Sequence, residues 1–430
     1  MKFLFKHLLF IKTPIVHNNE ALPSYFKKNL SPSLPLSSFI TSRAMLRHFF
    51  LTLFALLGAS LLNTARAENT SSVSYNALAL TSSFPDEVSP SCKENFSKEQ
   101  LEKAREIFLI CPDAGVNAAK ECSAHFADDI VCTDGSVVGR NRSEVELLFK
   151  NLLSEDLVEE WSLEVYREVC EDDLYVPFFM YNTTGWKFGE LKTDPIENVP
   201  GVSFIKFNAD FKVYDWRDFF GEGKLYEHVP LIGSLLAEKK RCLFSFLGDE
   251  NEKQRCKEEI TQPIMAVLAD GSEKTLPNQV SPSCSKYFTS EKLEAARDGV
   301  HCAENRKRLY SEESVYTDGL YSANNVSEID ETLSNMCSTY IYGRNWTISA
   351  ELCTKDGTYI SRQFLNADPS FEGVSFVRVG ENSKVFYRQD YLPDLKIYER
   401  DAQIGSLLGR IVKGYVDCLT SDGGCETFSF

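Results

Sequence analysis

The segment 212–220, with the sequence KVYDWRDFF, places one carboxylate among aromatic residues in a strand-like pattern. Side chains alternate between the two faces of a strand, so Asp218 shares its face with three aromatic residues. These are Tyr214, Trp216 and Phe220. A carboxylate in such surroundings must be hydrogen-bonded, paired or used in chemistry, because burying it alone is costly. We therefore treat Asp218 as a candidate catalytic residue and the three aromatic residues as candidate ligand-binding residues.

The same pattern returns 172 residues later, in the segment 384–392 with the sequence KVFYRQDYL. There Asp390 takes the place of Asp218, and Arg388 takes the place of Trp216. Arg388 and Asp390 lie two residues apart on one face of the expected strand, so they can form an ion pair. Such a pair would occupy the space that a substrate needs, and we expect no catalysis at this second position.

Four further landmarks occur in the same order in both halves of the chain. They are Val88-Ser-Pro-Ser-Cys92 with its counterpart at 280–284, Cys132-Thr-Asp-Gly135 with 316–319, Gly201-Val-Ser-Phe204 with 373–376, and Ile232-Gly-Ser-Leu-Leu236 with 404–408. Their order predicts a tandem repeat, with a first domain at 88–248, a tail and linker at 249–279, and a second domain at 280–430. We expect each repeat to fold as a complete unit.

Residues 1–67 are interpreted as a leader that does not belong to either domain. Within it, 45–67 has the features of a secretory signal, with a short basic start, an apolar run and an Ala-Arg-Ala cleavage site. Residues 1–44 are either an upstream extension or a targeting presequence, and 68–87 form a flexible lead-in. No later stretch approaches the roughly 18 apolar residues of a membrane span. We therefore expect a secreted protein, or one in the lumen of the secretory pathway.

All 13 cysteines follow residue 90, in the part of the chain that is expected to reach an oxidising compartment. None forms the C-x-x-C spacing of metal and redox motifs, so the sequence predicts disulfides. Several cysteine positions recur in both repeats, which predicts equivalent bridges, and the odd count leaves one thiol over. Six N-x-S/T sequons are candidate glycosylation sites: Asn69, Asn95, Asn141, Asn182, Asn325 and Asn345.

The formal net charge is −16, and it becomes more negative without the basic leader. Such a chain repels phosphate backbones, so we expect no nucleic-acid partner. Of the six histidines three lie in the leader, and the sequence has no phosphate-binding loop or dinucleotide-binding motif. We therefore predict neither a metal site nor a cofactor.

The first repeat begins with helical patterns, one after the capping residue Ser97 and another over 142–157. Strand patterns follow at 161–170, 174–182, 201–208 and 212–220. Helices followed by a run of strands predict an α+β fold, in which helices cover one face of a curved antiparallel sheet.

The order of these motifs resembles the nuclear transport factor 2-like superfamily, and it is most similar to SnoaL-like polyketide cyclases and limonene epoxide hydrolases. The resemblance covers about 90–245 and 282–415 and rests on the Thr-Asp-Gly strand, on Gly139 before a helix, on Gly-Val-Ser-Phe and on the Trp-Arg-Asp strand. It implies two tandem cone-shaped domains, each with helices packed on a strongly curved antiparallel sheet that encloses one pocket.

For epoxide hydrolases of this fold, the resemblance implies that Asp218 belongs to an Asp-Arg-Asp set and that Trp216 is a wall of the pocket. The candidate neighbouring strand at 175–182 carries neither the arginine nor the second carboxylate. Without them the acid–base pair is incomplete, which argues against epoxide hydrolysis in the first repeat.

Three functions remain open at this point. The first is the binding of a small apolar molecule in the first cone. The second is a SnoaL-like isomerase or cyclase, or an epoxide hydrolase-like enzyme, that uses Asp218. The third is a non-catalytic interaction module whose sheets pair between the repeats or between two chains. In that case Asp218 would only accept hydrogen bonds from its neighbours.

Overall fold

The computed structural model describes residues 83–420, with gaps at 112–115, 136, 153–157, 159, 189–190, 230–232, 244–249, 252–253, 257–273, 302–305, 319–320, 339–345, 366–370 and 394–404. These residues belong to one compact unit, Ala79–Phe430. The leader with its signal at 45–67, most of the lead-in, most of the linker, and the sequons at Asn69 and Asn345 lie outside the described residues.

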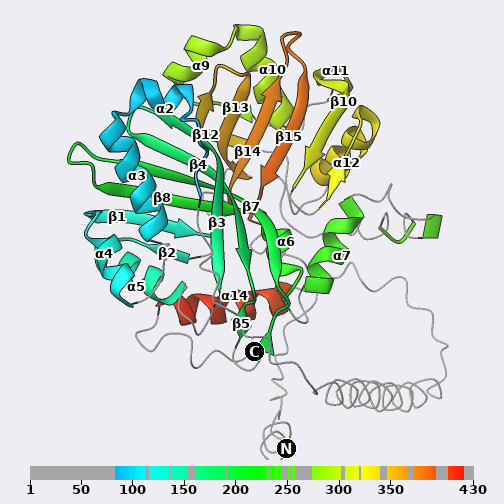
Figure 1. Ribbon diagram of the computed structural model, residues 1–430. Helices are drawn as coiled ribbons and strands as arrows, with labels where there is room; N and C mark the ends of the chain where they lie inside the picture. Colours follow the sequence, from blue (N-terminus) through cyan, green and yellow to red (C-terminus); the bar gives the residue numbers. More distant parts are fainter. Residues whose placement is uncertain are drawn as a thin grey trace, which may run out of the picture. The chain divides into compact units, whose positions relative to one another are not determined.

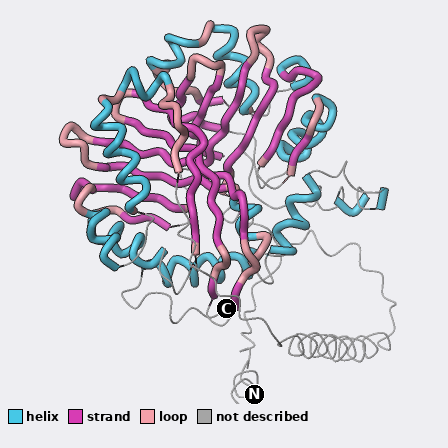
Figure 2. Tube along the Cα trace, viewed as in Figure 1, coloured by secondary structure: helices cyan, strands magenta, loops and turns pink. Residues whose placement is uncertain are grey.

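Two sheets with the same strand order form the centre of the described chain (Figures 1 and 2). The first has the order β2-β1-β8-β7-β4-β3. Its strands are β1 (Phe126–Asp134), β2 (Val137–Gly139), β3 (Trp161–Glu171), β4 (Leu174–Thr183), β7 (Ile196–Phe207) and β8 (Val213–Phe220). A small separate hairpin is formed by β5 (Lys187–Phe188) and β6 (Leu191–Lys192).

The second sheet has the order β11-β10-β15-β14-β13-β12-β9 and so repeats the first, with β9 added at one edge. Its strands are β9 (Lys274–Thr275), β10 (Tyr310–Thr317), β11 (Ser322–Ala323), β12 (Trp346–Cys353), β13 (Thr358–Leu365), β14 (Glu372–Val379) and β15 (Val385–Tyr391). The predicted α+β fold with two tandem sheet-and-helix halves is therefore confirmed.

One strand pair in each half differs from the expected antiparallel sheet. The pairs β1–β8 and β10–β15 run parallel, as does the added edge pair β12–β9, and the other pairs run antiparallel. A helix and three longer strands separate β1 from β8 in sequence, so no hairpin forces the two to run in opposite directions. The parallel pair matters for function because it aligns the same ends of β1 and β8.

The helices precede and follow the strands as the sequence predicts. In the first half they are α2 (Pro90–Asn95), α3 (Lys98–Ile110), α4 (Val116–Ser123), α5 (Arg142–Leu152), α6 (Glu222–Tyr226) and α7 (Gly233–Leu243). In the second half they are α9 (Pro282–Tyr287), α10 (Ser290–Val300), α11 (Arg306–Leu309), α12 (Val326–Ser338) and α14 (Gly405–Thr420). The expected cap Ser97 forms a capping box with Gln100 at the start of α3.

The repeated Ser-Pro-Ser-Cys landmark is a helix start in both halves. Ser89 caps α2 and Ser281 caps α9, each followed by a proline in the first turn, where a proline costs the helix nothing. The cysteine of each landmark forms a disulfide to an equivalent strand of its own sheet, Cys92 to Cys170 in β3 and Cys284 to Cys353 in β12. The prediction of equivalent bridges is confirmed for this pair.

Two further disulfides join Cys111 to Cys122 and Cys242 to Cys256, and Cys418 is also disulfide-bonded. Among the described residues Cys132 is a free, buried thiol, in keeping with the odd count.

The described helices include none that is long and apolar enough to cross a membrane.

Each sheet is buried on both faces. One face of the first sheet packs on α3, and the other meets the second sheet in a shared apolar cluster. In β4, Tyr175 and Phe179 point into the first core, whereas Val176 and Phe178 contribute to the shared cluster. A strand that is covered on both faces needs a continuous apolar run, which explains the sequence LYVPFF at 174–179.

An ion network crosses the contact between the sheets. Arg217 of β8 pairs with Asp215 and with Glu372 of β14, and Arg362 of β13 pairs with the same two carboxylates. Two arginines and two carboxylates therefore neutralise one another where polar residues would otherwise be buried alone.

Helix α14 crosses from the second half to the first (Figure 1). It packs on α5, and its residues Cys418 and Leu419 belong to the first core. The amide of Asn151 on α5 donates to the backbone oxygens of both, at 3.4 and 3.0 Å. The equivalent helix α7 contacts α12 of the second half, where Tyr321 Oη donates to the oxygen of Ala237 at 3.0 Å.

Four of the six sequons lie in the described residues. Asn141 and Asn325 immediately precede α5 and α12 at equivalent positions, and the side-chain oxygen of each accepts a hydrogen bond from the first turn. Asn95 lies at the end of α2, and Asn182 lies in β4. Glycosylation at the six sites stays a prediction.

Candidate functional site

Asp218 lies near the end of β8 and accepts two hydrogen bonds. The hydroxyl of Ser203 on the neighbouring strand β7 donates to Asp218 Oδ1, and Trp216 Nε1 donates to the same oxygen at 2.8 Å. Ser203 is directly opposite Asp218 in the register of β7 and β8. The expectation that Trp216 and Asp218 share one face of the strand is therefore correct.

Trp216 is a core residue of the first half. Only 1% of its surface is exposed, and its ring lies 5.3 Å from Phe149, 6.2 Å from Phe108 and 6.3 Å from Phe126. These aromatic contacts fix the indole, whose N–H then positions the carboxylate of Asp218. Phe220 is partly buried and packs edge-on against Phe179 with ring centroids 5.7 Å apart.

Tyr214 does not share the face of Trp216 and Asp218, contrary to the sequence expectation. The register pairs Phe207 with Val213 and Lys206 with Asp215, so Tyr214 is the extra residue of a bulge. The bulge places Val213 in the first core instead. The hydroxyl of Tyr214 donates to Asp173 in the β3–β4 turn at 2.9 Å.

A second carboxylate, which the sequence reasoning missed, lies beside Asp218. Asp134 ends β1, and the parallel register of β1 and β8 places it directly opposite Asp218. It is 8% exposed. Gly135 follows with a φ of +51°, where a side chain would be strained and would approach Glu222 Oε1 to 3.2 Å. The repeated Thr-Asp-Gly landmark was the signal that could have revealed Asp134.

The surroundings of the two carboxylates separate their pKa values. Burial, together with the negative charge of Asp218, raises the pKa of Asp134 to about 8. Burial also raises the pKa of Asp218, but the hydrogen bonds from Ser203 and Trp216 oppose the rise and leave it at about 6. Near neutral pH the pair therefore shares one proton and carries one negative charge.

A cavity of about 320 Å³ lies at the aligned ends of β1 and β8, and it is lined by Asp218 of the pair but not by Asp134. Asp218, Gly135 and Phe220 line it, together with apolar residues of both halves such as Val138 and Leu392. Arg217 and Glu372 also contribute, but they are engaged in the ion network between the sheets. The cavity is thus partly apolar, with Asp218 among its polar residues.

The second half has the same architecture with different chemistry. Asp390 accepts a hydrogen bond from Ser375 Oγ at 2.6 Å, as Asp218 does from Ser203. Arg388 then binds both carboxylate oxygens of Asp390, at 2.9 and 2.6 Å, and the two residues are almost wholly buried. The expected ion pair is present. In the first half Trp216 stands in the position of Arg388, so the carboxylate of Asp218 is not paired with a cation.

Among the described residues no group of three or more His, Cys, Asp or Glu side chains could hold a metal ion. No ion pair joins Asp134 or Asp218 to a cation in this part of the chain. The candidate site therefore consists of Asp134, Asp218 and their donors Ser203 and Trp216, with Phe220 at the cavity.

Comparisons with known proteins find similar structures but no similar sequence. No protein-family model matches the chain, and a search of curated proteins finds no match. One matching structure is a protein of the SnoaL-like polyketide cyclase type from Shewanella putrefaciens, with 11% identity and a TM-score of 0.27, over 34% of this chain and 97% of its own. An LEH-like epoxide hydrolase of M. tuberculosis has 16% identity and a TM-score of 0.24, over 32% and 93%.

A steroid delta-isomerase from Pseudomonas aeruginosa also matches, with 13% identity and a TM-score of 0.23, over 39% of this chain and 98% of its own.

Proposed function

We propose that the first half binds a small, largely apolar molecule at the cavity beside Asp218 and transfers a proton to or from it. The observation that carries the proposal is the direct alignment of Asp134 and Asp218 on paired strands, with pKa values raised to about 8 and about 6. A neutral acid beside a charged base is the arrangement that proton-transfer enzymes build at neutral pH.

The roles of the two carboxylates follow from their protonation. Asp218, ionised above pH 6, acts as the base that removes a proton from carbon next to a carbonyl group. Asp134 does not line the cavity; protonated below about pH 8, it adds no second negative charge beside the place where charge develops on the substrate. Phe220 provides an apolar contact for the rest of the molecule. This chemistry is an isomerisation or cyclisation and does not require the missing Asp-Arg-Asp set.

The experiment that tests the proposal measures deuterium uptake by small cyclic ketones in D2O, followed by proton NMR. The wild-type protein is expected to accelerate exchange at carbons next to the carbonyl group, with a bell-shaped pH dependence between about 6 and about 8. Asp218→Asn should lower the rate by about 10² to 10⁴, the usual contribution of a general base.

Asp129→Asn is the matched control, because Asp129 is an exposed residue of the same strand as Asp134. It should leave exchange unchanged. Wild-type exchange equal to that of Asp218→Asn across the ketone panel would show that Asp218 does not act as a base. Binding of the same ketones with equal affinity to both forms would then support a binding protein.

Binding without chemistry is the second candidate function, because Asp218 is already satisfied by Ser203 and Trp216. A carboxylate that accepts two hydrogen bonds can have a purely structural role, in which it orders the core.

Export from the cell is part of the same proposal, and four described disulfides support it. Mass mapping of the natural protein, with its N-terminus and its glycans, tests this part.

A further inference from the structure

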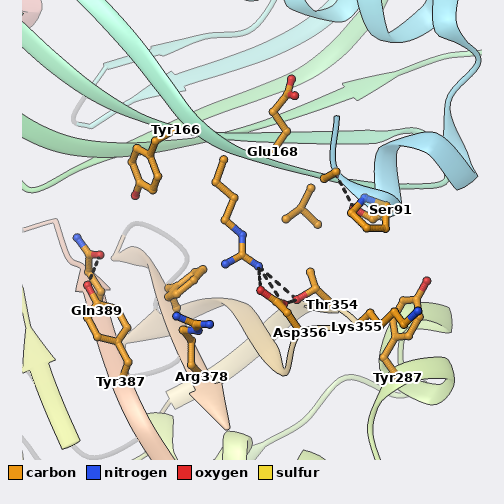
Figure 3. Close-up of a pocket in the computed structure, with 15 residues that line it drawn as sticks. Ser91, Tyr166, Glu168, Tyr287, Thr354, Lys355, Asp356, Arg378, Tyr387 and Gln389 are labelled. Atoms are coloured by element: carbon orange, nitrogen blue, oxygen red, sulfur yellow. Dashed lines mark hydrogen bonds and ion pairs between the residues drawn. The ribbon is translucent and has the colours of Figure 1, made fainter. Parts of the chain in front are cut away.

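A second cavity, of about 630 Å³, lies between the two halves and away from the carboxyl pair (Figure 3). The first half contributes the start of α2 and the strand β3. The second half contributes the end of α9, the turn between β12 and β13, and the strands β14 and β15. A volume of this size suits a drug-sized organic molecule.

Cationic groups outnumber anionic groups in this cavity. Arg167, Lys355 and Arg378 line it, against the single available carboxylate of Asp356. Glu168 also contributes to the wall, but its carboxylate accepts hydrogen bonds from Arg105 and Tyr175 in the first core. Figure 3 shows the Glu168 side chain directed away from the cavity. The excess of positive charge is notable in a chain of net charge −16.

Arg167 is already occupied. It donates to Asp356 at 3.2 Å and to Thr358 at 3.0 Å, and its guanidinium lies 5.1 Å from the centre of the Phe376 ring. Burial lowers the pKa of Arg167, and so does the positive charge of Arg378 nearby. Asp356 forms its ion pair with Arg167, but the charge of Arg378 also lowers the pKa of Asp356, so one carboxylate serves two guanidinium groups.

Arg378 forms no ion pair of its own among the described residues and shares the charge of Asp356 with Arg167. It projects from β14 into the cavity, with its guanidinium 5.1 Å from the centre of the Phe386 ring (Figure 3). Its Nε is buried and has no hydrogen-bond partner among the residues that the structure describes. A buried donor without an acceptor is costly, and an anionic ligand oxygen would satisfy it.

Aromatic side chains form the walls near Arg378. Tyr166 of β3 is 42% exposed and faces Tyr387 of β15 across the cavity (Figure 3). Tyr387 donates to Gln389 Oε1 at 2.9 Å, and its ring packs on Phe376 with centroids 6.0 Å apart. Both rings line the cavity, so a flat apolar group that is bound there can contact them.

We propose that this cavity binds a small organic anion with an aromatic body, whose acidic group is held by Arg378 and whose ring lies between Tyr166 and Tyr387. A guanidinium with a free donor recognises a carboxylate or sulfonate, and the aromatic walls hold the rest of the molecule. The site needs residues from both halves, so it exists only where the two sheets pack together. It is independent of the proton-transfer function of the first half.

The test compares two fluorescent probes on the full-length protein. 8-Anilinonaphthalene-1-sulfonate carries an anionic group, and N-phenyl-1-naphthylamine has the same aromatic body without it. The anionic probe is expected to bind with one saturable site. Arg378→Gln should weaken its affinity about 10-fold or more while leaving that of the neutral probe within about two-fold, since only the charged hydrogen bond is lost. Tyr166→Ala should weaken both probes.

Two controls keep the result interpretable. Arg308→Gln removes an exposed arginine of α11 and should change neither affinity. Arg378→Lys keeps the charge and should retain binding of the anionic probe better than Arg378→Gln, which also guards against a variant that merely unfolds. Equal affinity of the anionic probe for wild-type, Arg378→Gln and Tyr166→Ala proteins, or an absence of saturable binding, would overturn the proposal. Equal loss of both probes in Arg378→Gln would refute the role of the anionic group.

Discussion

The two halves differ most at a single residue, the one that lies two positions before the buried aspartate. In the second half Arg388 neutralises Asp390, and in the first half Trp216 donates one hydrogen bond and leaves the charge of Asp218 in place. A buried ion pair keeps both of its charges and takes little part in proton transfer. Two buried carboxylates that lie side by side, in contrast, share protons. One substitution between repeats therefore separates a structural aspartate from a candidate catalytic one.

The carboxyl pair predicts a pH-dependent stability whose sign can be derived. The pKa values of Asp134 and Asp218 in the folded protein, about 8 and about 6, lie above the value of about 4 for an unfolded aspartate. Between about pH 4 and pH 8 the folded state binds more protons than the unfolded state. Stability from this pair is therefore complete at low pH and is lost as the pH rises through the folded values.

Asp134→Asn should remove most of this dependence, because an amide stays neutral at every pH. Between pH 5 and pH 8.5 the free energy of unfolding of the wild-type protein is expected to fall by at least about 1 kcal/mol relative to that of the variant. This fall lowers the Tm of the wild-type protein by a few degrees. Calorimetry of both proteins across this range measures the difference. Parallel curves of Tm against pH would mean that Asp134 titrates like a solvated carboxylate.

The sequence predicted one carboxylate of the pair and missed the other for a physical reason. Asp218 stands out because the period of its own strand places it among aromatic residues. Asp134 is 84 positions earlier, and only the parallel pairing of β1 with β8 brings it close. Strand periodicity is local information, whereas strand pairing is not. The bulge at Tyr214 was hidden for a similar reason, since one extra residue reverses the face of every residue before it.

At the scale of elements, the crossing of α14 shows the same limit. The repeated Ile-Gly-Ser-Leu-Leu landmark marks equivalent positions in both halves, and the structure shows that the helices α7 and α14 begin there. It could not indicate which core each helix covers, because the two cores are themselves equivalent and offer similar apolar surfaces. The choice is made by contacts such as the buried amide of Asn151, which binds the carbonyl oxygens at the end of α14.

Asn151→Leu is expected to loosen α14 while leaving the sheets intact. Leucine has the same branching at Cγ but no amide, so the carbonyl oxygens of Cys418 and Leu419 lose a buried donor, at a cost of about 1–3 kcal/mol. Hydrogen exchange followed by mass spectrometry should show faster exchange in α14 and α5. Exchange in α3, which packs on the opposite part of the first core, serves as the internal control. Unchanged protection of α14 would contradict its anchoring by Asn151.

At the scale of the whole chain, the two halves depend on each other in three ways. The sheets share an apolar cluster, the ion network of Arg217 and Glu372 crosses between them, and α14 completes the first core. Sequence repetition predicts two complete units, because the same landmarks recur in the same order in both halves. The side-chain contacts argue instead for a pair of units that stabilise each other, since an apolar sheet face that is exposed to water is unfavourable.

A protease site inserted between residues 257 and 273 tests this mutual dependence in the intact protein. After cleavage the two fragments are expected to remain associated in size-exclusion chromatography under native conditions, because the contacts between them are unaffected by the cut. An SDS gel without reductant checks that no disulfide joins them. In moderate urea the fragments should separate and lose their secondary structure together. Each fragment then exposes the sheet face that the other half had covered. Fragments that elute apart immediately after cleavage, each with an unchanged Tm, would show that the repeats are independent domains and that the contact between the sheets contributes little to stability.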